Sequence, residues 1–357
     1  MLKKLFIIIP LFILSACGGG GGDNPNTIDN IVNPTASINS SSTEVLIGSS
    51  VSLSWESTNA TSCLASGSWS GTKAQRGTEA VVVTIPGVNN FSISCAGTNG
   101  GNASASTSVE GYRETQGVTV DGYIRQADIF IDTNDSFSLD SGEFSSSSDN
   151  EGKFNIRYAD GNLISLGGYD VDTGNDLNNL LIMHKITGHS DFKALTPVTS
   201  IAAFMSDASL VNAALGIDLS IDTPTFDPVA GMGDGGMNDY LYEKGNQLTV
   251  LAYALQNVTN NLNVTTETTQ DYFKAIAEEV ESEYSTTSLK VDIETLSFIT
   301  KVMDKIITSK NVTIEDANKT KLISALAAVL PIIEVKSSTA LTSAVFNFAT
   351  STLQTDT

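Results

Sequence analysis

The stretch Ala127-Asp128-Ile129-Phe130-Ile131 is rich in β-forming residues. It leads directly into the acidic segment Asp132-Thr133-Asn134-Asp135-Ser136-Phe137-Ser138-Leu139-Asp140-Ser141-Gly142-Glu143. β-Branched and aromatic residues favour extended chain, whereas Asp, Asn, Ser and Gly favour turns. The stretch therefore predicts a strand that ends in a polar loop. This places β structure near the middle of the 357-residue chain.

The acidic segment has the spacing of a calcium loop. Calcium takes about six to eight hard oxygen ligands, which alternate residues of a tight loop direct toward one centre. The ligand positions are filled by the side chains of Asp132, Asn134, Ser136, Asp140 and Glu143 and by the carbonyl of Ser138. Phe137 departs from the pattern, because its position normally turns with glycine. A solvated acidic hairpin loop without metal is the alternative to calcium binding.

Strand signals on both sides of this loop predict a β domain over residues 117–195. The order of its parts is a strand, an acidic loop that ends in Gly-Glu, an Asp-containing turn at Asp149-Asn150-Glu151-Gly152, and the strand Lys153-Phe154-Asn155-Ile156. This order resembles the prealbumin-like B-type repeats of bacterial surface adhesins, including collagen adhesins. The resemblance implies a β-sandwich and weakens beyond Gly161.

Residues 34–112 predict another β-sandwich, because short strands such as Val51–Trp55 and Phe91–Cys95 alternate with Gly, Asn and Ser turns. The strings Ser54-Trp55, Ser66-Gly67-Ser68-Trp69-Ser70-Gly71 and Ser94-Cys95 resemble immunoglobulin-like modules of secreted and surface proteins. Trp55 is expected in the core. Trp69, in a Ser/Gly-rich setting, is either a core residue or an exposed aromatic that stacks on sugars.

Residues 196–357 predict an all-α C-terminal domain, because apolar residues recur there with helical periodicity. The fold class is therefore multidomain, with two β-sandwich domains followed by a helical domain that is long enough to bury its own core. The expected helices cover Ile201–Leu215, Tyr240–Leu262, Thr269–Tyr284, Ile293–Ile307, Ile314–Val335 and Leu341–Leu353.

The N-terminus has the parts of a bacterial export signal. Residues 1–16 combine Lys3 and Lys4 with an apolar run too short to span a membrane permanently. The following Leu14-Ser15-Ala16-Cys17 resembles the lipobox of bacterial lipoproteins, which implies cleavage before Cys17 and acylation of that residue. Residues 17–33 then form a lipidated Gly-rich tether. An ordinary secretory peptide with an incidental cysteine is the alternative.

Cysteine count and charge agree with export. Once Cys17 carries lipid, Cys63 and Cys95 remain as a pair in an oxidising compartment, so we expect a disulfide between them. Without Lys3 and Lys4 the chain has 17 basic and 40 acidic residues, a formal net charge of −23. This charge opposes binding to nucleic acid. The two histidines, His184 and His189, lack the context of a zinc site.

Together these features predict an outer-membrane lipoprotein that is exposed at the cell surface, although a periplasm-facing orientation is left open. Its expected function is non-enzymatic adhesion, matrix attachment or scaffolding, with calcium as cofactor, the membrane bound through the lipid anchor, and an unidentified protein or polysaccharide as ligand. Two alternatives come from other classes of function. One is a polysaccharide-binding lipoprotein that uses Trp69, Tyr240 and Tyr242, and the other is an envelope enzyme with a carboxylate site in the helical domain.

Overall fold

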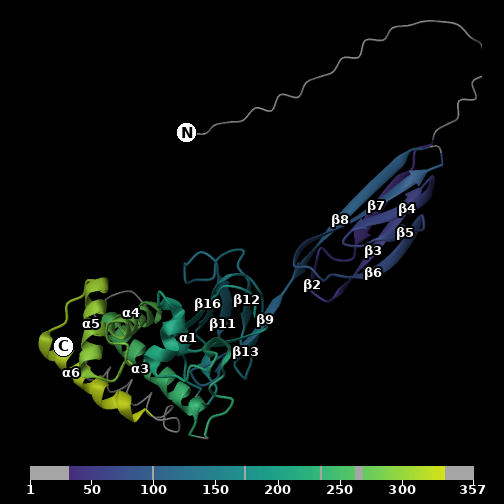
Figure 1. Ribbon diagram of the computed structural model, residues 1–357. Coiled ribbons are helices and arrows are strands. Elements are labelled where there is room, and N and C mark those ends of the chain that lie inside the picture. Colours follow the sequence, from purple (N-terminus) through teal and green to yellow (C-terminus); the bar gives the residue numbers. More distant parts are fainter. Residues whose placement is uncertain (1–31, 99, 173, 234, 262–267, 334–357) are drawn as a thin grey trace, which may run out of the picture. The chain divides into compact units, whose positions relative to one another are not determined.

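The computed structural model describes residues 32–98, 100–172, 174–233, 235–261 and 268–333 (Figure 1). These residues form two compact units. The first holds 32–41, 52–81 and 90–108, and the second holds 42–51, 82–89 and the described residues from 109 onward. The signal segment 1–16, Cys17, most of the tether and the helix expected at Leu341–Leu353 lie outside the described residues.

The first eight strands build two sheets in the N-terminal part of the chain, and all of β2 and the ends of several other strands belong to the second unit. One sheet has the order β1-β3-β6 and the other the order β2-β8-β7-β4-β5. The strands are β1 (Thr35–Ser40), β2 (Glu44–Leu46), β3 (Ser50–Thr58), β4 (Ala60–Gly67), β5 (Gly71–Lys73), β6 (Arg76–Val82), β7 (Gly87–Gly97) and β8 (Asn102–Tyr112).

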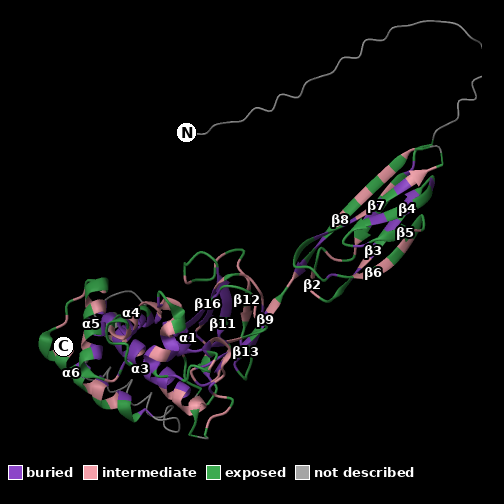
Figure 2. Ribbon diagram, viewed as in Figure 1, coloured by how far each residue is buried: buried purple, intermediate pink, exposed green. Residues whose placement is uncertain are grey.

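Alternation of polar and apolar residues explains why these strands form a sandwich. In β3 and β7 every second side chain is buried, as the alternating colours in Figure 2 show. Leu53 and Trp55 from β3 face the interior, as do Phe91 and Ile93 from β7, and none of the four is more than 8% exposed. Because side chains of a strand point alternately to its two faces, this pattern buries one face of each sheet and leaves the other in water.

Nine further strands form a four-stranded sheet of order β12-β11-β14-β16, a three-stranded sheet of order β13-β9-β17 and a small pair, β10-β15. Within the second sheet β17 runs parallel to β9, while the other pairings are antiparallel. The strands are β9 (Glu114–Thr119), β10 (Ile124–Arg125), β11 (Asp128–Asp132), β12 (Ser145–Ser147), β13 (Lys153–Arg157), β14 (Gly161–Leu166), β15 (Tyr169–Asp170), β16 (Leu181–Ile186) and β17 (Phe192–Leu195).

Helices follow the last strand, and in Figure 1 they gather beside the strands of the same unit. They are α1 (Pro197–Phe204), η1 (Ala208–Leu210), α2 (Val211–Leu215), η2 (Thr223–Thr225), α3 (Met237–Asn261), α4 (Gln270–Thr287), α5 (Leu296–Lys310), α6 (Asp316–Val329) and η3 (Leu330–Ile332). None of the helices in the described residues is long and apolar enough to cross a membrane.

The prediction of one helix over Ile201–Leu215 is wrong in its bounds. The chain forms α1, which begins earlier and ends at Phe204, and then the separate helix α2. Thr196 starts α1 with a capping box, in which its hydroxyl accepts from the Thr199 amide at 3.1 Å. After α1 the chain turns, and the Glu281 carboxylate of α4 accepts from the amides of Ser206 and Asp207. These bonds to a distant helix compete with the local periodicity and divide the predicted helix into α1 and α2.

The strands and helices of the second unit share one hydrophobic core. A single cluster of buried residues includes Ile129 and Leu163 from the strands as well as Leu251, Phe273 and Phe298 from the helices. Each of these five side chains is fully buried. Neither the strand segment nor the helical segment therefore encloses this core alone.

Helical segments also complete the hydrogen bonds of the edge strand β16. The Leu181 amide donates to the Thr269 hydroxyl at 2.9 Å, and the Met183 amide donates to the Ser200 hydroxyl at 2.9 Å. The unpaired backbone donors of an edge strand cost free energy where they are buried. Where they are exposed, they can pair with strands of other molecules. Here hydroxyl groups from two helical segments take the place of a further strand.

The coarse part of the fold-class prediction is confirmed, namely β-structure followed by helices. The N-terminal part of the chain is mainly β-sheet in sandwich-like arrangement and the C-terminal part is helical. The boundaries 34–112, 117–195 and 196–357 stay predictions. The core shared across residue 196 shows only that the last two segments pack on each other.

Candidate functional site

The segment predicted as a calcium loop connects β11 to β12 in an antiparallel hairpin. Its first residue, Asp132, is fully buried. The Asp132 carboxylate accepts backbone hydrogen bonds from Asn134 at 3.1 Å, Ser136 at 3.2 Å and Phe137 at 2.9 Å. Three donors compensate the cost of burying this carboxylate and wrap the first half of the loop around it.

Glu143 closes the second half of the loop. One of its carboxylate oxygens accepts from the Thr133 amide at 2.7 Å, and the other accepts from the Asp140 amide at 3.0 Å. The Asn134 amide group donates to Asp140 at 2.9 Å. Hydrogen bonds from Asn134 and then from Ser136 lower the pKa of Asp140. The side chains at the first and last ligand positions thus hold the ends of the loop together.

Phe137, the residue that departs from the calcium pattern, turns as glycine would. Its φ of 56° lies in the left-handed region, which is unfavourable for a bulky side chain. The Phe137 ring packs against Phe204 of α1, with ring centroids 6.1 Å apart, and joins a cluster around Phe130 and Met183. This apolar contact offsets the backbone strain and attaches the loop to the helical segment.

The donor set of the loop fits a hard cation in part. Asp132, Asn134, Ser136, Asp140 and Glu143 bring oxygen atoms to one short loop, as calcium requires. Within the described residues, however, no three His, Cys, Asp or Glu side chains converge closely enough to hold a metal ion. Backbone amides already occupy the carboxylates of Asp132 and Glu143. Calcium binding therefore stays a prediction.

Of the two alternatives for Trp69, the structure shows the core residue and not the exposed, sugar-stacking aromatic. Trp69 is 6% exposed, and its ring packs edge-on against Trp55 with centroids 5.3 Å apart. Its indole N–H donates to the Ser92 carbonyl at 3.0 Å. The Trp69 ring therefore belongs to the core of the sandwich.

The two tyrosines of the polysaccharide alternative are also committed to the fold. Tyr242 is 4% exposed, and it packs with Val118 and Val120 of the β segment. The Tyr240 hydroxyl donates to the Leu215 carbonyl at 2.7 Å. With Trp69 in the core as well, two of the three aromatic residues offered for sugar stacking are buried, and Tyr240 is half-buried.

Cys63 and Cys95 form a disulfide in the structure. The two residues are directly opposed in the β4–β7 pairing, so the bond lies within one sheet and does not join two sheets. Both cysteines are at most 2% exposed. This placement differs from the inter-sheet bridge of antibody domains.

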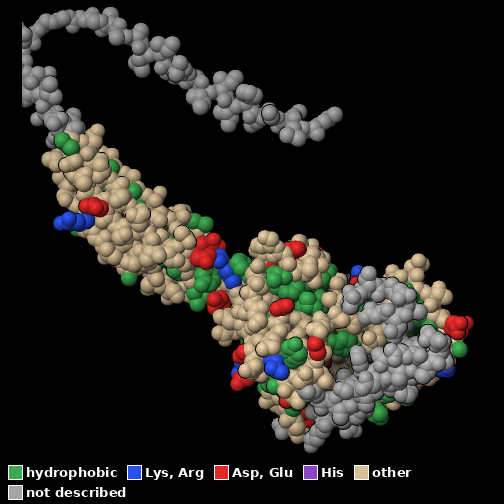
Figure 3. Space-filling view, turned by 180° about the vertical axis from the view of Figure 1, so that it is seen from behind, with side chains coloured by type: hydrophobic (Ala, Val, Ile, Leu, Met, Phe, Trp, Pro, Cys, Tyr) green, Lys and Arg blue, Asp and Glu red, His purple; other side chains and the backbone are tan. Residues whose placement is uncertain are grey.

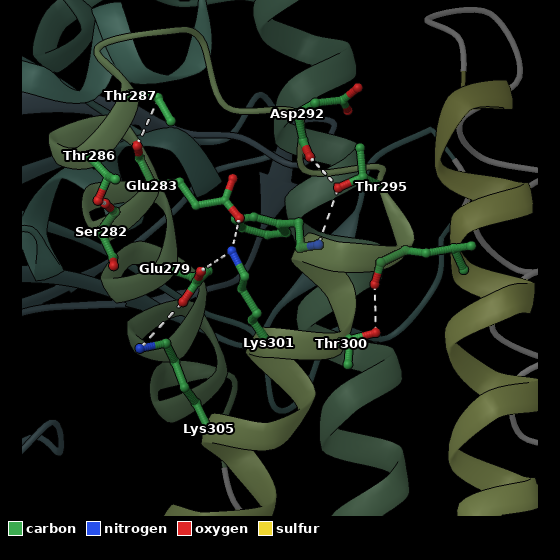
Figure 4. A network of polar contacts seen from close by, with 12 residues as sticks. Glu279, Ser282, Glu283, Thr286, Thr287, Asp292, Thr295, Thr300, Lys301 and Lys305 are labelled. Carbon is green, nitrogen blue, oxygen red and sulfur yellow. Dashed lines mark hydrogen bonds and ion pairs between the residues drawn. The ribbon is translucent and has the colours of Figure 1, made fainter.

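Several carboxylates of the helical segment have structural partners. In Figure 4 Glu279 of α4 lies between Lys301 and Lys305 of α5, with N–O distances of 3.3 and 3.5 Å. Lys301 also pairs with Glu283 at 2.7 Å. Glu279 is 5% exposed, so these two lysines stabilise a nearly buried charge. The network fastens α4 to α5.

Asp121 is a titratable group that no sequence motif indicates. It follows β9 and accepts a hydrogen bond from the Thr249 hydroxyl of α3 at 2.9 Å. Burial raises the pKa of Asp121 to about 7, the Thr249 hydrogen bond opposes this rise, and the nearby charge of Asp170 adds to it. An acid that ionises near neutral pH is thus placed where a strand segment meets α3.

The comparisons with known proteins give no family. No protein-family model matches the chain, and no curated protein is significantly similar to it. Solved structures that match in part include a 1.5-MDa bacterial ice-binding adhesin studied for host cell surface retention, with 10% identity over 45% of this chain and 66% of that chain and a TM-score of 0.19. This chain therefore covers less than two thirds of the length of that adhesin structure.

Two further solved structures match a similar share of the chain. Fibronectin(III)-like modules of Clostridium thermocellum CbhA match with 13% identity, 43% of this chain, 98% of that chain and a TM-score of 0.18. A tetra-tandem repeat from the extending region of a large adhesion protein matches with 13% identity, 43% of this chain, 48% of that chain and a TM-score of 0.19. Likeness at such TM-scores carries no argument about function.

Replacing Asp121 with Asn tests the electrostatic account of this group. Because its folded pKa lies above the unfolded value of about 3.9, the neutral acid is favoured in the folded state. Its contribution to stability is therefore complete below that unfolded pKa and is lost as pH rises toward about 7. Asp121→Asn keeps an acceptor for Thr249 but cannot ionise. Between pH 5 and pH 8 the free energy of unfolding should fall in the wild type as Asp121 ionises. In the variant we expect this fall to be smaller by about 1 to 3 kcal/mol.

Urea unfolding at a series of pH values measures this difference. Asp128→Asn, at an exposed position of β11, is the matched control and should retain the wild-type pH profile. Identical profiles for the wild type and Asp121→Asn would show that Asp121 ionises in the folded chain as it does in the unfolded one.

Proposed function

We propose that the chain is an envelope-anchored surface lipoprotein whose mature part acts in non-enzymatic adhesion or scaffolding. The observation that carries the proposal is the buried Cys63–Cys95 disulfide, in a unit that follows a lipobox-like sequence at Cys17. Disulfides persist in oxidising compartments outside the cytoplasm. A chain that is exported, held by lipid and folded around such a bond is suited to the cell envelope.

The surface and the committed carboxylates support binding over catalysis. On the face shown in Figure 3 acidic and basic side chains are scattered, and most of the surface is backbone and uncharged polar groups. A dispersed negative charge supports solubility more than it marks a single acidic site. In the helical segment Glu279, Glu281 and Glu294 each bind lysines or backbone amides, so their role is structural.

We also propose that the loop from Asp132 to Glu143 binds calcium weakly, as extracellular modules often do. The alternating oxygen donors and the left-handed turn at Phe137 support this proposal. A cation would add ligand bonds to a loop that is now closed by hydrogen bonds alone. Because Phe137 packs on Phe204, a cation that makes the loop more rigid would also strengthen the contact between the loop and α1.

The lipoprotein assignment is tested in bacterial cells that produce the full chain. We expect radiolabelled palmitate to be incorporated into the wild type and not into Cys17→Ala, because the thiol of Cys17 is the acylated group. Added protease should degrade the wild-type chain on intact cells. Missing palmitate would contradict the lipid anchor, whereas labelled chain that resists protease would contradict exposure at the cell surface.

The calcium proposal is tested by thermal unfolding of the mature chain in a calcium titration. For a dissociation constant of roughly 10⁻⁴ to 10⁻³ M, calcium at roughly 10 mM stabilises by about 1.4 to 2.7 kcal/mol and raises the melting temperature. Glu143→Gln should remove this response, and magnesium should produce less of it. A wild-type melting temperature that calcium leaves unchanged would refute the proposal.

A further inference from the structure

The second unit contains a cavity of about 300 Å³ that none of the sequence motifs indicates. It lies between β16, α1, the η1–α2 segment and η2, and it is lined in part by the apolar side chains of Ala202, Ala203, Val211 and Ile221. Pockets that enclose small molecules have about this volume and a mainly apolar wall with few polar groups. The polar groups in this wall therefore determine what the cavity can bind.

Most of those polar groups already have partners. The Asn212 side chain donates to the Ile221 carbonyl at 2.8 Å and accepts from the Thr223 hydroxyl at 2.6 Å. The Thr199 hydroxyl donates to the Thr196 carbonyl at 2.8 Å. These bonds orient the wall and use the hydroxyl donors of Thr199 and Thr223.

His184 of β16 is different. It is 8% exposed, lines the cavity, and makes no side-chain hydrogen bond to any part of the chain that the structure describes. Neither ring nitrogen is among the fully enclosed polar atoms without a hydrogen bond, so both still reach open space. Because His184 lines the cavity and its ring nitrogens reach open space, the donor and the acceptor of the imidazole are available to a molecule bound there.

The charges around His184 favour an anion. Burial, followed by the positive charge of Lys193, lowers the pKa of His184 to about 4, and Asp222 opposes this effect. The imidazole is therefore neutral at pH 7, with one N–H donor and one acceptor nitrogen. Lys185 and Asp222 both line the cavity. With Lys193 nearby, two cations stand against one carboxylate, so a single negative charge would balance the site.

We propose that this cavity binds a small organic monocarboxylate, with the ligand carboxylate accepting a hydrogen bond from His184 and the apolar body of the ligand packing on Ala202, Ala203, Val211 and Ile221. Lys185 and Asp222 are exposed residues of the cavity wall, so they lie where the cavity meets solvent. This binding activity goes beyond adhesion and does not depend on the calcium loop. It makes the second unit a small-molecule binding module.

The chain offers a direct test because it has only two histidines. In the mature chain labelled at histidine, NMR gives two sets of imidazole signals, and His189→Gln assigns them. His189 is the internal control, because its ring already bonds the Glu114 carbonyl at 2.9 Å. The probes are hexanoate and, as a neutral analogue of the same chain length, hexan-1-ol.

At pH 7 we expect hexanoate to shift the His184 signals saturably and to leave those of His189 in place. Hexan-1-ol should bind roughly tenfold more weakly, which corresponds to about 1.4 kcal/mol for the charged contact. Ala203→Leu, which fills the cavity, should abolish the shift. Unmoved His184 signals in the wild type, or equal shifts of both histidines, would overturn the proposal. Equal affinity for hexan-1-ol would overturn the assignment to a carboxylate.

Discussion

The hydrophobic core that strands and helices share in the second unit is the constraint on which the rest of that unit depends. Residues from Ile129 in β11 to Leu326 in α6 belong to one buried cluster. Apolar burial contributes roughly 25 cal/mol per Å², so separating the two segments would lose the stabilisation that comes from this shared cluster. The hydroxyls of Thr269 and Ser200 accept hydrogen bonds from two amides of β16, and these bonds fix how the helical segments lie against this strand.

Three features of the candidate sites lie along this contact. Phe137 holds its left-handed turn because its ring reaches Phe204 of α1. His184 lies on β16 but faces a cavity that α1 and α2 help to form. Asp121 follows β9 and bonds to Thr249 of α3. In each case one partner comes from the strands and the other from the helices, so changes at these residues act on the same packing.

The sequence predicts these elements unequally. Helical periodicity locates α3 to α5 well, because their apolar residues recur with the spacing that packing requires. Strands with alternating apolar residues, such as β3, are also found. The Cys63–Cys95 pairing follows from cysteine count and compartment. The sequence leaves the placement of Trp69 open, because local composition does not report its contact with Trp55. The environments of Asp121 and His184 arise only from tertiary packing.

Native-state hydrogen exchange of the mature chain tests the shared core most directly. If the core is one cooperative structure, slow amides of β11 and β14 and those of α3 to α5 open with the same free energy, and Leu251→Ala lowers that free energy equally in strands and helices. The account is contradicted if the helices exchange at a lower free energy than the strands, or if Leu251→Ala weakens the helices and leaves the strands unchanged.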